Sequence, residues 1–140
     1  PMAGEVAAWT LARGRVEGIR NIPMESIPDA YRGMDLLVLP SRTTPTWKEQ
    51  FGRVLVEAMA SGVPVLGSSS GAIPEVLGDA GAVFPEGDVR ALARTIADLL
   101  ADPSRRTGMS ARGRDRAEKK YAWPVWAART AEFLGECAGK

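Results

Sequence analysis

The chain has 140 residues, of which 45% are hydrophobic and 25% charged, and its formal net charge is +1. This length suffices for one domain with a core, and the composition is that of an ordinary globular protein. The near-neutral charge gives no electrostatic reason to expect a nucleic-acid partner. The sequence contains no histidine and a single cysteine, Cys137, which excludes imidazole catalysis, an intrachain disulfide and a thiol-rich metal site.

Helix and strand signals alternate at short intervals. Short continuous apolar runs predict buried strands, and capped segments with a helical apolar period predict helices. In chain order, the predicted elements are a helix over residues 3–11, a strand over 15–20, a helix over 26–33, a strand over 35–39, a helix over 52–61, a strand over 63–67, a helical turn over 73–77, a strand over 82–84, and helices over 88–100, 103–120 and 123–134. This order predicts an α/β fold: a Rossmann-like parallel sheet with helices on both faces, in one domain over residues 1–140.

Local signals give finer expectations for the helices. Ser26 and Asp88 are predicted N-caps. Trp123 and Trp126, three positions apart, are predicted to anchor the last helix. The helix over residues 88–100 is predicted to bury one apolar face, made of Leu92, Ile96, Leu99 and Leu100.

Two loops leave the carboxyl ends of predicted strands, where open parallel sheets bind their ligands. They cover residues 40–51 and 67–72, and both are rich in small or hydroxylated residues. The serines of the second loop are expected to be solvated and to line a pocket. The helix that begins at Gly52 offers unpaired backbone N–H groups from Phe51 to Val54, and its dipole favours a phosphate there.

Two carboxylates flank this helix start. Glu49 lies in the loop and Glu57 inside the helix, with seven residues between them. A helical projection puts Glu57 next to Arg53 and Ser61, on the flank of the predicted buried face. That face consists of Val54, Leu55, Ala58 and Met59. Glu57 could accept hydrogen bonds from two vicinal hydroxyls, as on a ribose, and Glu49 could do so for a second sugar. By spacing alone, the competing interpretation is a solvated Glu57 that pairs with Arg53 at i, i+4.

Three stretches carry a more specific pattern: Asp35-Leu36-Leu37-Val38-Leu39-Pro40-Ser41, the E-x7-E segment that runs from Glu49 through Glu57-Ala58-Met59-Ala60-Ser61-Gly62 to Val65, and Gly71-Ala72-Ile73-Pro74-Glu75-Val76. Together they resemble the donor-binding half of retaining glycosyltransferases with the GT-B architecture, group 1 or family 4. The resemblance covers roughly residues 16–126.

The resemblance implies a role for each part of the pattern. Glu57 would hold the nucleotide ribose, Glu49 would face the donor sugar as the catalytic candidate, and the amides from Phe51 to Val54 would bind the diphosphate. The loop around Asn21 and Ile22 would touch the base. The implied donor-binding residues are Glu57, Phe51, Gly52, Arg53, Val54, Ser41, Asn21 and Ile22.

Two positions depart from the family pattern. Arg20 stands near the place where members usually carry a glycine, which puts the base contacts in question. Ala72 stands where the second of two paired glycines is usual, and its methyl group is expected to narrow the pocket.

The resemblance also implies an incomplete C-terminal domain of a two-domain enzyme, without the first strands of that domain and without the acceptor-binding N-terminal domain. The implied reaction moves a sugar from a nucleotide-sugar donor to a sugar, lipid-linked or other glycan acceptor, in the cytoplasm or at the periphery of the inner membrane. No metal or other cofactor is expected, because the sequence has no Asp-x-Asp and a helix N-terminus with basic residues can replace a cation.

Two other function classes stay open at this point. One is a nucleotide-binding or interaction module without transferase activity, which the intact pair Glu49 and Glu57 disfavours. The other is a GT-B sugar-nucleotide epimerase, which the context Pro40-Ser41 disfavours. A sheet without its first strands is expected to expose an edge or an apolar patch, through which two copies of the chain would associate. The basic residues between 105 and 120 alternate with acidic ones and are expected to form a solvated face.

Overall fold

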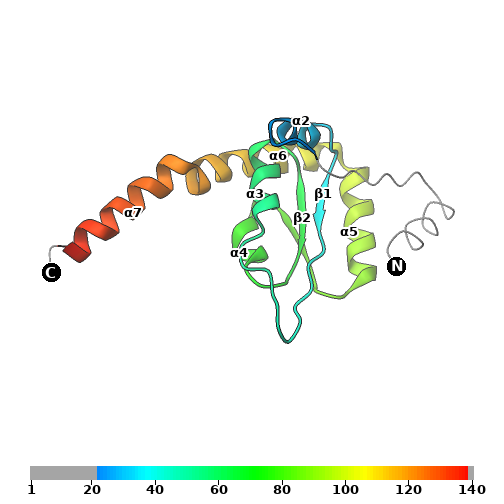
Figure 1. Cartoon of the computed structure of the whole chain (residues 1–140). Helices are drawn as coiled ribbons and strands as arrows, with labels where there is room; N and C mark the ends of the chain where they lie inside the picture. The colour runs from blue at the N-terminus through cyan, green and yellow to red at the C-terminus, as the bar shows by residue number, and fades with distance from the viewer. Residues whose placement is uncertain (1–21, 139–140) are drawn as a thin grey trace.

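The computed structural model describes residues 22–138, and its centre is a sheet of three parallel strands (Figure 1). The strands are β1 (Leu37–Leu39), β2 (Val65–Ser68) and β3 (Ala82–Phe84), in the spatial order β1-β2-β3. These strands confirm three of the four predicted ones. The helix predicted over residues 3–11 and the strand predicted over 15–20 lie outside the described residues.

Helices connect the strands and continue after them. They are η1 (Met24–Ser26), α2 (Ile27–Arg32), α3 (Arg53–Ala60), α4 (Ile73–Leu77), α5 (Val89–Ala101), α6 (Pro103–Arg116), η2 (Ala117–Tyr121) and α7 (Trp123–Ala138). In Figure 1, α3 and α4 lie on one side of the sheet and α5 on the other. The predicted α/β architecture, with helices on both faces of a parallel sheet, is therefore confirmed.

The strand β2 is buried along its whole length because each of its faces packs into a separate core. Val65 belongs to the core formed with Leu55 and Met59 of α3. Leu66 belongs to the core formed with Leu99 of α5 and Met109 of α6. Consecutive residues of a strand point to opposite faces, so this division of the apolar run follows from its alternation.

Gly67 in β2 allows α4 to approach the sheet closely. A Cβ atom at this position would lie 2.4 Å from Cγ2 of Ile73, which is closer than packed atoms tolerate. The glycine therefore fixes how α4 and the loop before it sit over the end of β2.

Several helix expectations need correction. Ser26 is no side-chain cap, since it lies in the 3₁₀ turn η1 with helical backbone angles. Asp88 does cap α5, because its Oδ1 accepts a hydrogen bond from the backbone N–H of Ala91 at 2.8 Å. The helix predicted over 103–120 is regular only as far as Arg116, and a π-helical turn, η2, follows it. Leu100 is 50% exposed, because it lies on the side of α5 that faces away from the core.

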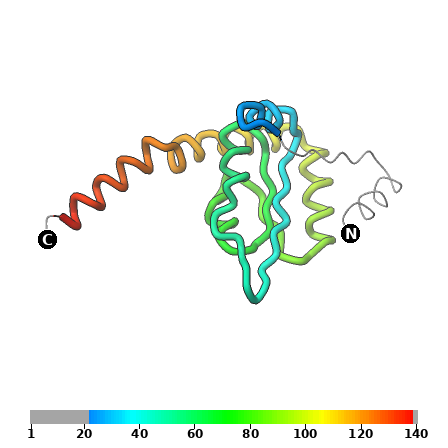
Figure 2. Tube along the Cα trace, in the orientation of Figure 1, coloured from blue at the N-terminus to red at the C-terminus, as the bar shows by residue number. Residues whose placement is uncertain are grey.

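The prediction that Trp123 and Trp126 anchor the last helix is wrong. Their exposed fractions are 83% and 46%, and α7 has no buried residue. The reason is visible in the tube of Figure 2: after η2 the chain runs away from the sheet and ends far from it. Trp123 therefore lies mostly in solvent, and Trp126 is only about half covered.

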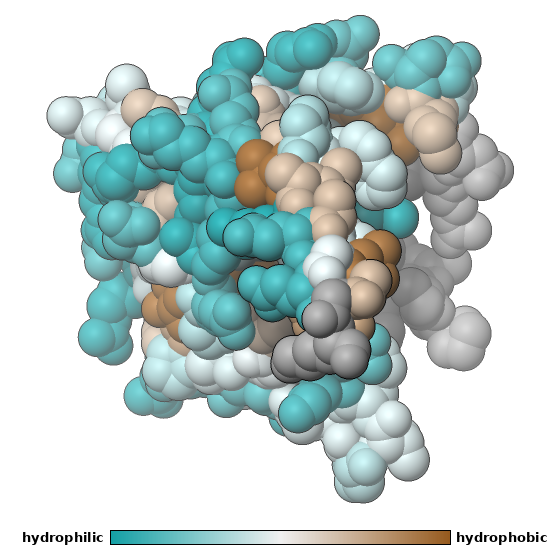
Figure 3. Space-filling view, turned by 90° about the vertical axis from the view of Figure 1, so that its left-hand side faces the viewer, coloured by the Kyte–Doolittle hydropathy of each residue, from teal (hydrophilic) through white to brown (hydrophobic). Residues whose placement is uncertain are grey.

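The surface on the side toward which α7 projects is mostly hydrophilic and carries small, separate hydrophobic patches (Figure 3). None of the helices described in residues 22–138 has the length and apolar character needed to cross a membrane. Association of two copies through the sheet edge stays a prediction.

The neighbours Leu99 and Leu100 test the packing of α5. Leu99 is fully buried and Leu100 is half exposed. Leu99→Ala should lower the free energy of unfolding by about 2–5 kcal/mol, the range for a buried leucine. Leu100→Ala, the matched control, should change it by no more than about 0.5 kcal/mol. Urea denaturation of both variants makes the measurement, and equal losses would contradict this placement of α5.

Candidate functional site

The loop that leaves β1 ends at the N-terminus of α3, and Gly52 makes this junction. Gly52 is the N-cap residue and has a left-handed backbone, with φ of 75°, which costs a glycine little. A Cβ atom here would lie 3.0 Å from Cδ1 of Leu55. The sharp turn brings the end of the loop against the positive end of the helix dipole.

Glu49 occupies that positive end with its own carboxylate. Its Oε1 accepts a hydrogen bond from the backbone N–H of Gly52 at 3.0 Å, and its Oε2 accepts one from Oγ of Ser41 at 3.2 Å. The amides of Phe51, Arg53 and Val54 have no protein acceptor within residues 22–138. The predicted row of open amides is therefore confirmed at these three positions, whereas the amide of Gly52 is already bonded.

The backbone of Glu49 is fixed by the loop that follows β2. Its carbonyl oxygen accepts a hydrogen bond from the N–H of Ala72 at 3.0 Å. Gly71, with φ of 55°, passes so close that a Cβ atom there would lie 1.9 Å from the same oxygen. Ala72 packs against the core with its methyl group, and the narrowing of the pocket by this methyl stays a prediction.

Two of the three serines of the second loop, Ser68 and Ser70, brace the first loop, which corrects the expectation that they are solvated, whereas Ser69 is exposed as expected. Ser68 and Ser70 are fully buried. Oγ of Ser68 donates to the carbonyl oxygen of Ser41 at 2.6 Å, and the hydroxyls of Ser70 and Thr43 share a hydrogen bond at 2.9 Å. Buried hydroxyls need such partners, so these bonds tie the two loops together.

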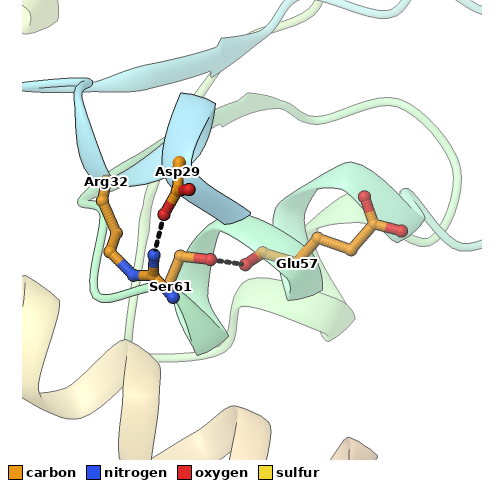
Figure 4. Close-up of polar contacts among 4 residues, drawn as sticks. All are labelled: Asp29, Arg32, Glu57 and Ser61. Atoms are coloured by element: carbon orange, nitrogen blue, oxygen red, sulfur yellow. Dashed lines mark hydrogen bonds and ion pairs between the residues drawn. The ribbon is translucent and has the colours of Figure 1, made fainter. Parts of the chain in front are cut away.

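Glu57 lies one turn further along α3 and is held by two side chains. Its Oε1 is 3.2 Å from Nε of Arg53, and its Oε2 accepts a hydrogen bond from the hydroxyl of Tyr31 at 2.9 Å. The ion pair with Arg53 is the one that the competing interpretation expected. Ser61 donates only to the backbone carbonyl of Glu57, and in Figure 4 the carboxylate points away from Ser61 and from the pair Asp29–Arg32.

A groove of about 540 Å³ runs past Glu57, between α2 and α3. The side chain of Glu57 is 39% exposed there. The groove combines one carboxylate and one guanidinium with a mainly apolar wall. Its lining residues are Met24, Ile27, Pro28, Tyr31, Arg53, Glu57, Ala60 and Ser61.

Tyr31 is the site residue that the sequence analysis missed. It is only 9% exposed, and its pKa is raised from 10.0 to about 12, first by burial and then by the hydrogen bond and negative charge of Glu57. Its signal in the sequence was its place four residues after Ile27, on the same face of α2. A buried tyrosine usually needs a polar partner for its hydroxyl, and Glu57 of the neighbouring helix is that partner.

The remaining predicted residues lie in different surroundings. Phe51 is 37% exposed, and its ring contacts that of Tyr121 nearly at right angles, with ring centres 5.5 Å apart. Val54 is 38% exposed, which corrects its assignment to the buried face of α3. Ile22 is 37% exposed at the start of the described chain, and Asn21 lies outside the described residues. Across residues 22–138, no three His, Cys, Asp or Glu residues gather in a way that could hold a metal ion.

The close approach of Gly71 to Glu49 can be tested against Gly62. Both glycines have positive φ, but no atom of residues 22–138 lies within 4 Å of a Cβ atom built on Gly62. Gly62→Ala should cost about 1–2 kcal/mol of unfolding free energy, the penalty for a left-handed alanine. Gly71→Ala should cost clearly more, because the loop at Glu49 must also move. Equal costs in urea denaturation would show that the close approach is absent.

The raised pKa of Tyr31 can be measured directly. The folded chain holds this proton more tightly than the unfolded chain, so the resulting stability is complete below pH 10 and is lost as the pH rises through about 12. The difference in tyrosinate absorbance between the wild type and Tyr31→Phe should show one ionisation with a midpoint near pH 12. A midpoint near the ordinary value of 10.0 would mean that the hydroxyl is solvated.

The chain is similar in sequence to a known protein family and to several of its members. The chain matches the model of the family Glycosyl transferases group 1 over residues 6–116. It is 39% identical, over 119 residues, to a GDP-mannose-dependent alpha-(1-6)-phosphatidylinositol monomannoside mannosyltransferase of Mycolicibacterium smegmatis, and this match covers 82% of the chain and 31% of the relative. The chain spans about a third of the length of the curated relatives it matches.

Solved structures share the fold. Sucrose-phosphate synthase from Thermosynechococcus elongatus is similar with a TM-score of 0.83 and 28% identity, over 99% of this chain and 34% of that one. Anabaena HepE, solved in complex with UDP and glucose, is similar with a TM-score of 0.76 and 25% identity, over 96% of this chain and 35% of that one. Sequence, fold and relatives agree, and the chain belongs to the family Glycosyl transferases group 1.

Proposed function

We propose that this chain binds the nucleotide-sugar donor of a glycosyltransferase that transfers the sugar with retention of anomeric configuration. One observation carries the proposal: in a member of this family, Glu49 and Glu57 flank the first turns of a helix whose amides at Arg53 and Val54 have no protein acceptor within residues 22–138. A nucleotide sugar has hydroxyls at both ends and a diphosphate between them. The site offers a carboxylate acceptor for the hydroxyls at each end and N–H donors for the diphosphate between them.

Glu57 is the proposed ribose contact. Two vicinal hydroxyls can donate to one carboxylate, which has about four acceptor positions. The groove beside Glu57 has an apolar wall that includes Met24 and Pro28, and such a wall suits the flat face of a base. The proposed base contacts at Asn21 and Ile22 adjoin this wall in the sequence.

The N-terminus of α3 is the proposed diphosphate site. The amides of Arg53 and Val54 are available as donors, and the helix dipole favours an anion. Arg53 adds a positive charge that is 85% exposed and pairs with Glu57 only through Nε, which leaves its other guanidinium N–H groups available to a phosphate. Phe51, Gly52 and Ser41 shape this end of the site. The proposal includes no metal, because these groups can neutralise the leaving diphosphate.

Glu49 is the proposed contact to the donor sugar. It sits between the loop from β1 and the start of α3, and its three side-chain and carbonyl oxygens accept hydrogen bonds from Ser41, Gly52 and Ala72, while Gly71 passes close to its backbone. Such a rigid carboxylate can be aimed at a sugar without the cost of ordering a flexible loop. Its contact can tighten as the glycosidic bond breaks.

Acceptor binding is proposed to belong to an N-terminal domain of a larger protein, with this chain as part of its C-terminal domain. The named relatives suggest candidates for the donor: one is GDP-mannose-dependent and one was solved with UDP and glucose. One relative is named as acting on a phosphatidylinositol monomannoside. By analogy, the whole protein is proposed to work in the cytoplasm, at the periphery of the inner membrane, with a lipid-linked glycan as acceptor.

The ribose role predicts a loss of nucleotide affinity in Glu57→Ala. Calorimetry with GDP and UDP should show the tighter of the two weakened by about 1–3 kcal/mol, the range for lost hydrogen bonds to a charged group. Glu118→Ala is a matched control, because Glu118 forms the same kind of i, i+4 pair with Arg114, at 3.0 Å. Unchanged affinity in Glu57→Ala would leave Glu57 as a solvated helix residue, the competing interpretation.

The sugar role predicts a different result for Glu49→Gln. This variant keeps an oxygen for the N–H of Gly52, so the loop stays in place. It should spare the affinity for the free nucleoside diphosphate and lower kcat, because the contact exists only with the intact donor. Glu57→Gln should weaken the free diphosphate and the nucleotide sugar alike. Donor-dependent kinetics and diphosphate calorimetry test this, and equal loss of diphosphate affinity in both variants would refute the division of roles.

A further inference from the structure

We infer that Tyr31 is a positioning residue for Glu57: its hydroxyl fixes the carboxylate in the orientation in which it meets the nucleotide ribose. The inference rests on the proposed function of Glu57 and adds a residue from another helix to the same site. Tyr31 itself makes no contact with the ligand. It acts only through the hydrogen bond that joins α2 to α3.

The ring of Tyr31 is a rigid support for this bond. It is 9% exposed and belongs to the core that also contains Leu55, Ala58 and Met59 of α3. A packed ring loses little further freedom when its hydroxyl bonds, because the core has already fixed its rotamer. The hydroxyl therefore reaches Oε2 of Glu57, at 2.9 Å, from a fixed point.

The other contacts of Glu57 fix its carboxylate less well. Arg53, the partner of Oε1, is 85% exposed, and an exposed ion pair between long side chains holds its geometry weakly. Arg53 is also the side chain that the proposed function turns toward the diphosphate. Ser61 bonds to the backbone carbonyl of Glu57 and leaves the carboxylate unrestrained (Figure 4).

The hydrogen bond leaves room for the ligand. Tyr31 uses one acceptor position on Oε2, and a carboxylate has about four. The side chain of Glu57 is 39% exposed, and the groove that it enters is also lined by Tyr31. Since the pKa of Tyr31 is raised to about 12, its hydroxyl keeps its proton and stays a donor at neutral pH.

Loss of the hydroxyl should therefore cost affinity without removing the ribose contact itself. In Tyr31→Phe the carboxylate gains rotamers and must be ordered again when the nucleotide binds. Ordering one flexible side chain corresponds to about a 3- to 10-fold loss of affinity. The loss should depend on the ribose hydroxyls, because Tyr31 reaches the ligand only through Glu57.

Calorimetry of the whole chain tests this with GDP, UDP and the 2′,3′-dideoxy form of whichever diphosphate binds more tightly. Tyr31→Phe should weaken the natural diphosphate by about 3- to 10-fold and leave the dideoxy form unchanged. In a Glu57→Ala background, Tyr31→Phe should have no further effect. Tyr121→Phe is the control, because it removes another phenol hydroxyl, bonded to the carbonyl of Val76 at 3.3 Å, and should bind as the wild type does.

The outcomes separate the inference from the proposed function. An equal loss with the natural and dideoxy forms would show that Tyr31 supports the fold only, and would overturn the inference. So would unchanged affinity in Tyr31→Phe, or a full effect in the Glu57→Ala background. A wild type that binds neither GDP nor UDP would overturn the proposed function and the inference with it.

Discussion

The site depends on how Glu49 is fastened between two loops and a helix. Its carboxylate bonds to the amide of Gly52, and its carbonyl bonds to the amide of Ala72. The first bond places a negative charge at the positive end of α3, which stabilises a helix start. The second joins the loop after β1 to the loop after β2, across the carboxyl edge of the sheet. Without them, neither the start of α3 nor the direction of Glu49 would be set.

The two cores, one on each face of the sheet, hold the strands and helices between which these loops run. Val65 and Leu66 anchor β2 in opposite faces, and Gly67 lets α4 pack close to the strand. The loop from β2 to α4 therefore starts from a fixed strand and ends in a fixed helix. The buried serines of this loop restrain the conformation of the loop that carries Glu49 through hydrogen bonds, for example from Ser68 to Ser41. Parallel sheets are well suited to such sites, because their loops meet at one edge.

The sequence predicted the elements better than the contacts between them. Apolar runs such as 35–39 and 63–67 identify strands because burial on both faces requires them. The unpaired N–H groups at the start of α3 could be predicted because a glycine before an apolar helical segment marks where the helix begins. The hydrogen bond from Tyr31 to Glu57 joins residues 26 positions apart, and no local pattern encodes it. The same holds for buried Ser68 and for Leu100, whose burial depends on what packs beside α5.

The π-helical turn η2 separates the domain body from α7. With 16 residues, α7 is about 24 Å long. A rotation of such a helix by ~10° about its first turn would displace its last turn by ~4 Å. Tyr121 lies at the pivot, just before α7 begins, and its ring touches Phe51 beside the start of α3. A rotation of α7 about this point would therefore displace the contact between Tyr121 and Phe51 far less than the end of the helix.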